Sequence, residues 1–336
     1  MSSFDFVGLQ LENRYVRSAT ATSTCDNDSG IPGQKFYEIY ESLARGHVGL
    51  LIQEHSFVSL RGHANHKQLG LHTDEMIQYH QKANEIMRAA NDKIKICCQL
   101  AHAGPNGNTE NKLLINEATV ADFEEVVQQF KEAALRAKQA GYDCVQIHSG
   151  HTYLLSQTIS DFYNKRTDEY RASDFKLLRD VLEAVRTVDI PVGVKLQCDD
   201  FIEGHSMNAV SACKIISALK FDFIEVTGGG QGNGAKYSTA RVGKDKYYYK
   251  HVIQELKIHN LLDKQPVIVT GGFENVEDAQ QAFNDGVYLV GYSRKFLRNP
   301  NFLIDEDVKK CIRCNQCAIA VHKGEYAHCV IDQNKK

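Results

Sequence analysis

The sequence predicts a single (β/α)8 barrel, the TIM-barrel fold, with a short cysteine-rich C-terminal extension. Strand-length runs alternate with helical stretches along nearly the whole chain. The runs are rich in Val, Ile and Leu with little polar alternation, as expected for parallel strands that are covered on both faces. At 336 residues the chain has a length that such barrels commonly use as one domain.

Eight strand-like runs and seven helical stretches support this fold. The runs lie at residues 15–19, 48–53, 94–100, 144–148, 192–196, 223–227, 267–270 and 288–291. The helical stretches lie at residues 33–45, 75–91, 122–140, 173–187, 207–219, 248–261 and 274–285. We expect Asp122 and Ser173 to cap two helix starts, and Gly141 and Gly286 to follow two helix ends. The alternative, an open doubly wound sheet, would more often carry an early glycine-rich turn, which is missing after the first strand. We assign residues 1–305 to the barrel and 306–336 to a tail packed on it.

Composition and charge argue against several classes of partner. A net charge of −3 gives no reason to expect nucleic acid or an anionic membrane. The longest apolar runs are far below the roughly 18 residues needed to cross a bilayer, and the N-terminus has no secretion-signal pattern. We therefore expect a cytoplasmic protein. Six cysteines are scattered through the chain, and we expect buried free thiols there: Cys25, Cys97, Cys98, Cys144, Cys198 and Cys213.

The stretch 141–170 is the candidate reaction centre. A strand-like run ends at His148, and His151 and Tyr153 follow within a few residues. Each of these side chains can donate or carry a proton, and active sites of barrels lie at the carboxyl ends of the strands. A histidine pair could instead bind a metal, but carboxylate ligands are missing from the neighbouring strand ends. The plainest alternative is a pair of ordinary loop histidines.

Other strand ends predict a flat ligand with an amide edge. The first strand ends in small residues and hydroxyls that allow close approach, at Ser18, Ala19, Thr20 and Ala21. Gln99, at the end of the third strand, can both donate to and accept from a heterocycle. Lys195, at the end of the fifth, needs an electron-rich partner because a buried lysine is costly when unpaired.

The last two strands predict a phosphate site. Gly271 and Gly272 follow the seventh strand, and Ser293 and Arg294 follow the eighth. Barrels commonly build phosphate sites from these two loops, although a Gly-Gly pair alone is more often just a turn. Flavin mononucleotide (FMN) is a ligand with all three properties: it is flat, it has an amide edge and it carries a phosphate.

In these motifs the chain resembles the old yellow enzyme family of FMN-dependent NADH:flavin oxidoreductases, over nearly its full length. The residues that carry the resemblance are 13–20 (NRYVRSAT), 99–104 (QLAHAG), 147–154 (IHSGHTYL), 164–170 (NKRTDEY) and 293–294 (SR). The resemblance implies that residues 18–21 line the flavin and that Gln99 binds its pyrimidine edge. It places Lys195 near flavin N1 and O2, and the phosphate at Gly271, Gly272, Ser293 and Arg294.

The resemblance also implies an ene-reductase reaction. NADH or NADPH reduces the flavin, and hydride then passes from flavin N5 to the β carbon of an α,β-unsaturated carbonyl or quinone-like substrate. His148 and His151 would hydrogen-bond the carbonyl oxygen, and Tyr153 would donate the proton. Members of the family are commonly oligomeric, and substrate choice would depend on loops such as 228–247.

Two departures from the family pattern motivate an alternative function. Ala21 stands where many members have Thr or Cys, and His55 stands where a small residue is usual. They raise the alternative of a catalytically weakened flavin- or metal-binding barrel that acts as a sensor or scaffold. The intact His148, His151 and Tyr153 argue against it. We expect His102 to lie behind the site, and Asn164, Arg166 and Asp168 to fold a loop.

The C-terminal tail carries a closely spaced group of cysteines, Cys311, Cys314, Cys317 and Cys329. Zinc or an iron–sulfur cluster is the usual ligand of such a group. Larger relatives of the family it resembles carry a [4Fe–4S] cluster at a similar motif, but here the second gap is one residue shorter. We expect unmetallated thiols ahead of either metal site.

Overall fold

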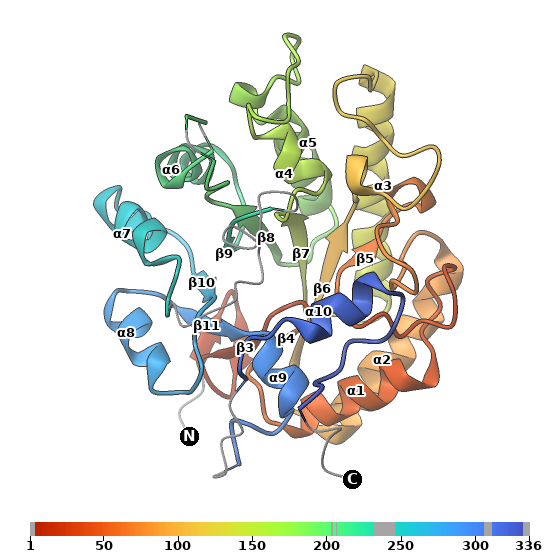
Figure 1. Cartoon of the computed structure of the whole chain (residues 1–336), viewed down its shortest axis with the longest axis vertical. Coiled ribbons are helices and arrows are strands. Elements are labelled where there is room, and N and C mark those ends of the chain that lie inside the picture. Colours follow the sequence, from red (N-terminus) through yellow and green to blue (C-terminus); the bar gives the residue numbers. More distant parts are fainter. Residues whose placement is uncertain (1–3, 203, 206, 231–245, 306–310, 332–336) are drawn as a thin grey trace.

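The computed structural model describes residues 4–202, 204–205, 207–230, 246–305 and 311–331. Within them, parallel strands close a barrel that is surrounded by helices (Figure 1). In order around the barrel the strands are β3 (Tyr15–Arg17), β4 (Leu50–Ile52), β6 (Lys95–Ala101), β7 (Cys144–Ser149), β8 (Val192–Gln197), β9 (Phe223–Thr227), β10 (Val267–Thr270) and β11 (Leu289–Tyr292). Because β3 pairs with both β4 and β11, and β4 also pairs with β6, the barrel is closed, which confirms the predicted fold over the open sheet.

The outer layer contains helices close to the predicted positions. They are α1 (Gln34–Arg45), α2 (Ile77–Ala90), α3 (Val120–Gln139), α5 (Lys176–Arg186), α6 (Ala209–Ala218), α7 (Lys250–Ile258) and α8 (Asp278–Asn284). The short elements α4 (Leu154–Thr158), α9 (Arg294–Arg298), α10 (Gln316–His322) and β5 (Ser56–Phe57) were not predicted. Short 3-10 turns lie at Leu60–Gly62, Asp74–Met76, Gly104–Asn106 and Ala172–Asp174. None of the helices described is long and apolar enough to span a bilayer.

Two predicted helix caps are wrong, and both predicted stops are confirmed. Thr119 is the N-cap of α3: it accepts a hydrogen bond from the Asp122 N–H while the Asp122 carboxylate accepts from the Thr119 N–H. Asp122 is therefore the third helical residue. α5 begins only after Phe175, whose φ of 51° is left-handed, so Ser173 lies outside that helix. Gly141 and Gly286 follow α3 and α8 with φ of 83° and 100°, a conformation that glycine adopts without strain.

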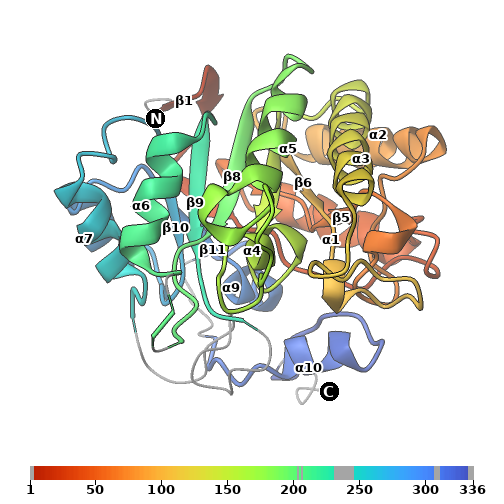
Figure 2. The same ribbon diagram turned by 90° about the horizontal axis from the view of Figure 1, so that it is seen from above.

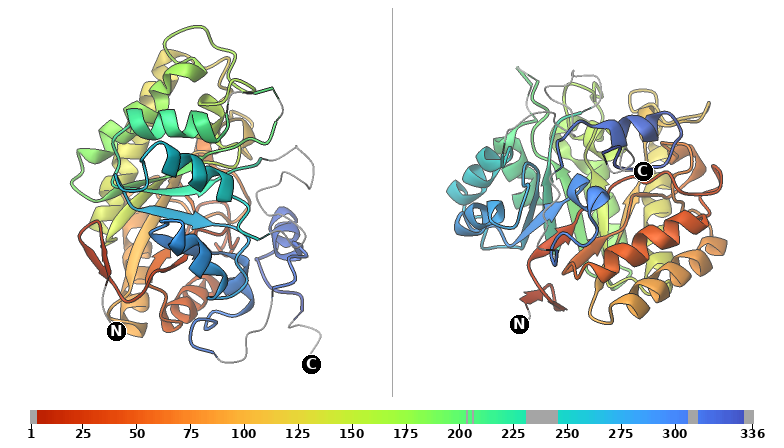
Figure 3. Two further views of the ribbon diagram at one scale, coloured as in Figure 1. Left: turned by 90° about the vertical axis from the view of Figure 1, so that its left-hand side faces the viewer. Right: turned by 60° about the horizontal axis from the view of Figure 1, so that its bottom comes forward.

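An antiparallel hairpin covers the amino-terminal end of the barrel. It consists of β1 (Phe4–Phe6) and β2 (Leu9–Leu11). Phe6 and Leu11 are fully buried against the inward-facing apolar side chains of the barrel, such as Val16 and Phe223. Figures 2 and 3 show this hairpin at one end of the barrel and α10 at the other. A ligand of the barrel is thus confined to the carboxyl ends of the strands.

The scattered cysteines lie in this packed interior. Cys97 and Cys144 face the inside of the barrel, and the other four lie in the core between the barrel and its helices. All six are buried free thiols, which confirms the prediction.

Candidate active site

Toward the carboxyl ends of the strands, the inward-facing side chains change from apolar to polar. Lys195 on β8 lies in register with His148 on β7 and with Glu225 on β9. Gln99 Nε2 donates to Gln146 Oε1 (2.5 Å), and Gln146 Nε2 donates to Glu225 Oε2 (2.9 Å). These side chains form a connected polar layer beneath the barrel mouth.

Glu225 is the partner of the buried Lys195. Lys195 Nζ lies 3.0 Å from Glu225 Oε1 and donates to Ser18 Oγ at 2.9 Å, and Ser18 in turn donates to Glu225. Burial alone would raise the pKa of Glu225, but Lys195 and the hydrogen bonds from Ser18 and Gln146 outweigh it and lower that pKa. The carboxylate is therefore ionised and paired with the ammonium group.

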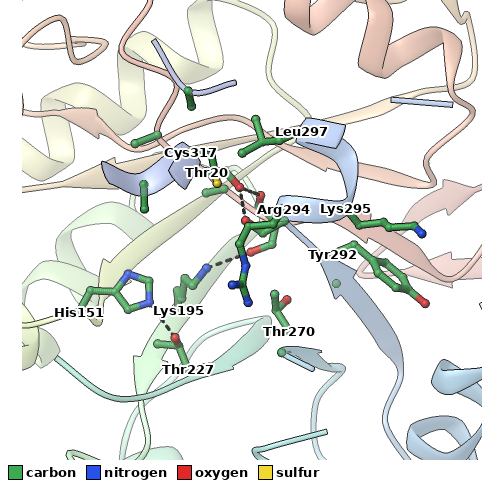
Figure 4. A pocket seen from close by; sticks show the side chains of 18 of the residues that line it. Thr20, His151, Lys195, Thr227, Thr270, Tyr292, Arg294, Lys295, Leu297 and Cys317 are labelled. Atoms are coloured by element: carbon green, nitrogen blue, oxygen red, sulfur yellow. Dashed lines mark hydrogen bonds between the residues drawn. The ribbon is translucent and has the colours of Figure 1, made fainter. Parts of the chain in front are cut away.

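One pocket above this layer gathers all the site residues expected from the strand ends. Its lining includes Ser18, Ala19, Thr20, Ala21, Gln99, His148, His151, Tyr153, Lys195, Gly271, Gly272, Ser293 and Arg294. Figure 4 shows Lys195, Thr270 and Arg294 reaching this space from different strands and loops. Other lining residues were not predicted as ligand contacts, among them Asn65, Thr227, Tyr248 and Arg313.

The glycine-rich end of the pocket leaves no room for a side chain at Gly272. Gly272 has a left-handed φ of 85°, and a side chain there would meet the Tyr247 backbone nitrogen at 2.4 Å. Thr20 Oγ1 and Ser293 Oγ lie 2.6 Å apart, within hydrogen-bond distance, and Arg294 begins α9 beside them. Hydroxyls, a guanidinium group and a glycine backbone are suitable donors for a phosphate.

The two histidines and Tyr153 form the opposite side of the pocket. Left-handed backbone at His151 and Thr152 (φ of 60° and 58°) turns the chain sharply after β7. The His148 ring lies 4.9 Å from the His151 ring and 5.2 Å from the Tyr153 ring, measured between centroids. His151 Nε2 lies 2.8 Å from Thr227 Oγ1.

Burial sets the protonation of these groups. It lowers the pKa of both His148 and His151 well below the usual value, so both rings are neutral at pH 7. It also raises the pKa of Tyr153 to about 12, so the phenol keeps its proton. Neutral imidazoles can act as hydrogen-bond donors rather than as acids, and the phenol holds a proton that it can donate.

The chemistry of the lining fits FMN. His148 Nδ1 and Thr270 Oγ1 are buried polar atoms without a hydrogen-bond partner in the described part of the chain, and both residues line the pocket. Because Gln99 Nε2 is engaged with Gln146, Gln99 Oε1 is the atom that can accept from a ring N–H. A polar ligand satisfies such atoms, which are costly when left unpaired.

A second buried carboxylate, Glu54, lies outside the polar layer at the end of β4. It accepts from the Thr22 N–H (2.6 Å) and from the Thr22 hydroxyl. Burial raises its pKa to about 7, although the Thr22 hydrogen bonds and the Arg17 charge oppose that rise. The folded protein therefore binds the Glu54 proton more tightly than the unfolded chain does.

This shift predicts a pH-dependent stability. Below the unfolded pKa of about 4.5 the contribution of Glu54 is fully present, and it is lost as pH rises toward about 7. We expect the unfolding free energy of the wild type, relative to Glu54→Gln, to fall by about 3 kcal/mol between pH 4.5 and 7.5. Urea unfolding of both proteins across this range measures it. The buried histidines titrate in both proteins, so their contribution to the unfolding free energy cancels in the difference. A difference that does not change with pH would contradict the prediction.

The C-terminal segment packs over the glycine-rich end of the pocket. Arg313 Nη2 donates to the Gly272 carbonyl (2.8 Å) and lies 3.2 Å from Glu274 Oε1. The Ala327 N–H donates to the Thr22 carbonyl at 2.8 Å.

The tail cysteines are distributed over different surroundings. Cys311 and Cys317 line the pocket, Cys314 is exposed, and Cys329 accepts from Arg298 Nη1 at 3.5 Å. The described residues contain no group of three or more metal-ligating side chains.

Comparison with known proteins identifies the family. The chain matches the NADH:flavin oxidoreductase / NADH oxidase family over residues 3–118 and 106–310. The chain belongs to this family. That membership confirms the resemblance to the old yellow enzymes.

Relatives and solved structures agree with this. The chain is 30% identical to an NADPH dehydrogenase of Bacillus cytotoxicus in an alignment that covers 90% of each chain. It is 28% identical to the NADPH dehydrogenase of a Geobacillus species over 89% of this chain and 91% of the relative. The structure of morphinone reductase matches with a TM-score of 0.72 and 20% identity, over 90% of this chain and 87% of that one. A 2-naphthoyl-CoA reductase matches with a TM-score of 0.86 and 19% identity, and there 97% of this chain spans 56% of the larger protein. At these identities both structures support the fold.

Proposed function

We propose that the pocket binds FMN and that the protein reduces the C=C bond of α,β-unsaturated carbonyl compounds, or similar electron-poor acceptors such as quinones. As a member of its family the chain is an FMN-dependent NAD(P)H oxidoreductase. The observation that carries the proposal is the meeting, in one pocket, of a phosphate-type cradle with two neutral histidines and a protonated tyrosine.

FMN would be held at both ends. Ser18, Ala19, Thr20 and Ala21 would line the ring, with Gln99 and Lys195 at its polar edge, and Gly271, Gly272, Ser293 and Arg294 would bind the phosphate. When bound, FMN supplies the transfer of hydride from NADH or NADPH to the acceptor. The Glu225 carboxylate moderates the charge that Lys195 presents to the ring.

The remaining residues would act on the acceptor. His148 and His151 would donate hydrogen bonds to its carbonyl oxygen, where negative charge develops as hydride arrives. Tyr153 would donate its proton to the α carbon. The buried, neutral state of both rings supports this role because a neutral imidazole donates without giving up its proton.

An anaerobic half-reaction experiment tests the proposal. The purified protein is expected to be yellow, to bleach with NADPH or NADH, and to recover its colour when cyclohexenone is added. Bleaching without recovery would exclude the ene-reductase activity and favour the sensor alternative. Absence of flavin from the purified protein would overturn the cofactor assignment as well.

We also propose that residues 1–305 form the FMN-binding barrel and residues 306–336 a tail packed on it, of which residues 306–310 and 332–336 lie outside the described residues. The contacts of Arg313 and Ala327 with the barrel support this division. We propose further that the protein is cytoplasmic and homo-oligomeric. Its partners would be small molecules, not nucleic acid or a membrane. Cys311, Cys314, Cys317 and Cys329 would stay unmetallated, and metal analysis of protein purified without oxygen tests this.

A further inference from the structure

His55 is the residue of the pocket that departs most clearly from the family pattern, and it contacts the proposed proton donor. His55 Nε2 lies 3.2 Å from the Tyr153 hydroxyl oxygen, and the two ring centroids are 5.5 Å apart. Asn65 Nδ2 approaches the same oxygen at 3.5 Å. His55, Asn65 and Tyr153 all line the pocket.

The backbones of His55 and Asn65 are joined by one buried side-chain amide. Gln68, which is 2% exposed, donates from Nε2 to the His55 carbonyl at 3.1 Å. Its Oε1 accepts from the backbone N–H groups of Ala64 (2.8 Å) and Asn65 (3.4 Å). The loop that carries Asn65 is therefore tied to the strand end that carries His55, and the backbones of both residues are held beside Tyr153.

The charge state of His55 shows that it is not an acid at pH 7, and its Nε2 donates to Tyr153 in the tautomer that carries the proton on that nitrogen. Burial, with smaller contributions from Lys195 and His63, lowers its pKa to about 4, so the ring is neutral at pH 7. A neutral imidazole has one N–H, and Asn65 Nδ2 is always a donor. When the Tyr153 hydroxyl points at a substrate, its oxygen can accept from both nitrogens.

We propose that His55 and Asn65 form a two-donor site that stabilises the Tyr153 phenolate. The inference rests on the proposed function. In the proton step the Tyr153 O–H bond breaks, a C–H bond forms at the α carbon of the substrate, and the negative charge moves to the Tyr153 oxygen. That oxygen later regains a proton from water. Because burial disfavours a phenolate, two N–H donors fixed on the oxygen lower the barrier of this step, as an oxyanion hole does for an alkoxide.

His55 and Asn65 are thus positioning residues that act through Tyr153. His55→Leu removes the N–H donor and puts an apolar side chain of similar volume in its place, whereas His55→Gln keeps an N–H donor. Each protein is reduced with NADPH without oxygen and then mixed with one of two acceptors. Cyclohexenone needs a proton at carbon, whereas ferricyanide takes single electrons and no such proton.

With cyclohexenone we expect His55→Leu to slow reoxidation about tenfold or more and Asn65→Leu about threefold, because the Asn65 contact is longer. His55→Gln should recover most of the rate. With ferricyanide all of these variants should match the wild type. In a Tyr153→Phe background, His55→Leu should cause no further loss, because the oxygen that it serves is missing.

Three results would overturn the inference while leaving the proposed function intact. In the first, His55→Leu reacts with cyclohexenone at the wild-type rate. In the second, His55→Leu slows reoxidation by cyclohexenone and by ferricyanide equally, and in the third it slows the Tyr153→Phe protein further. If the wild type itself is not reoxidised by cyclohexenone, the proposed function and this inference both fail.

Discussion

Tyr153→Phe is expected to leave reduction of the protein by NAD(P)H unchanged and to slow alkene reduction about 100-fold or more. General acids typically contribute 10²- to 10⁴-fold, and Tyr153 is the protonated acid that lies beside His148. The ring is 5% exposed and contributes to the wall of the pocket, which phenylalanine preserves. Stopped-flow measurement of the two half-reactions separates the effects.

Tyr79→Phe is the matched control for this variant. Tyr79 lies on α2 in the outer layer and packs against the core there. It should behave as the wild type in both half-reactions. Equal slowing of both half-reactions in Tyr153→Phe would count against a proton-donor role and point instead to a disturbed flavin site.

Lys195→Met is expected to lower the unfolding free energy of the flavin-free protein by about 3–5 kcal/mol. It leaves the fully buried Glu225 without its cation, and breaking a buried pair on one side costs about this much. Adding Glu225→Gln should recover most of the loss, because the carboxylate is then replaced by a neutral amide that keeps hydrogen bonds to Ser18 and Gln146. Urea unfolding of the single and double variants measures this.

Lys176→Met provides the surface control. Lys176 Nζ lies 2.7 Å from Asp180 Oδ2, a shorter distance than in the buried pair, but both side chains are partly exposed. Solvent screening should keep the loss below about 1 kcal/mol. If the double variant Lys195→Met/Glu225→Gln is no more stable than Lys195→Met alone, the unpaired Glu225 carboxylate is not the cause of the lost stability.

The barrel could be predicted because its strands are continuous apolar runs that need no long-range information. Strand ends were equally informative: Gln99 and Lys195 were found because each lies next to the last residue of a predicted strand. Glu225 and Gln146 were missed although they lie within predicted strands. Their inward direction follows from strand periodicity, but the contacts of Glu225 with Lys195 and of Gln146 with Gln99 depend on the register of neighbouring strands.

The local elements that were wrong or missed depend on competition between nearby side chains. Asp122 is a good N-cap residue, but Thr119 three residues earlier takes that position and leaves Asp122 to complete the capping box. The hairpin of β1 and β2 has strands of three residues each, too short to show a period. His55 was noticed as unusual, yet its partner Tyr153 lies 98 residues away in sequence.

The pairing of β3 with β11 has a consequence for how the chain assembles. Val290 lies opposite Tyr15, so the last strand of the barrel must meet the first across almost the whole chain. Closing so long a loop is entropically costly, and during synthesis it cannot occur until β11 has left the ribosome. Until then the edges of β3 and β10 that pair with β11 have no neighbouring strand. The apolar side chains inside the barrel are then exposed to solvent. A chain truncated before Leu289 would therefore lose the closed barrel as a whole, and we expect it to aggregate rather than to fold with one strand fewer.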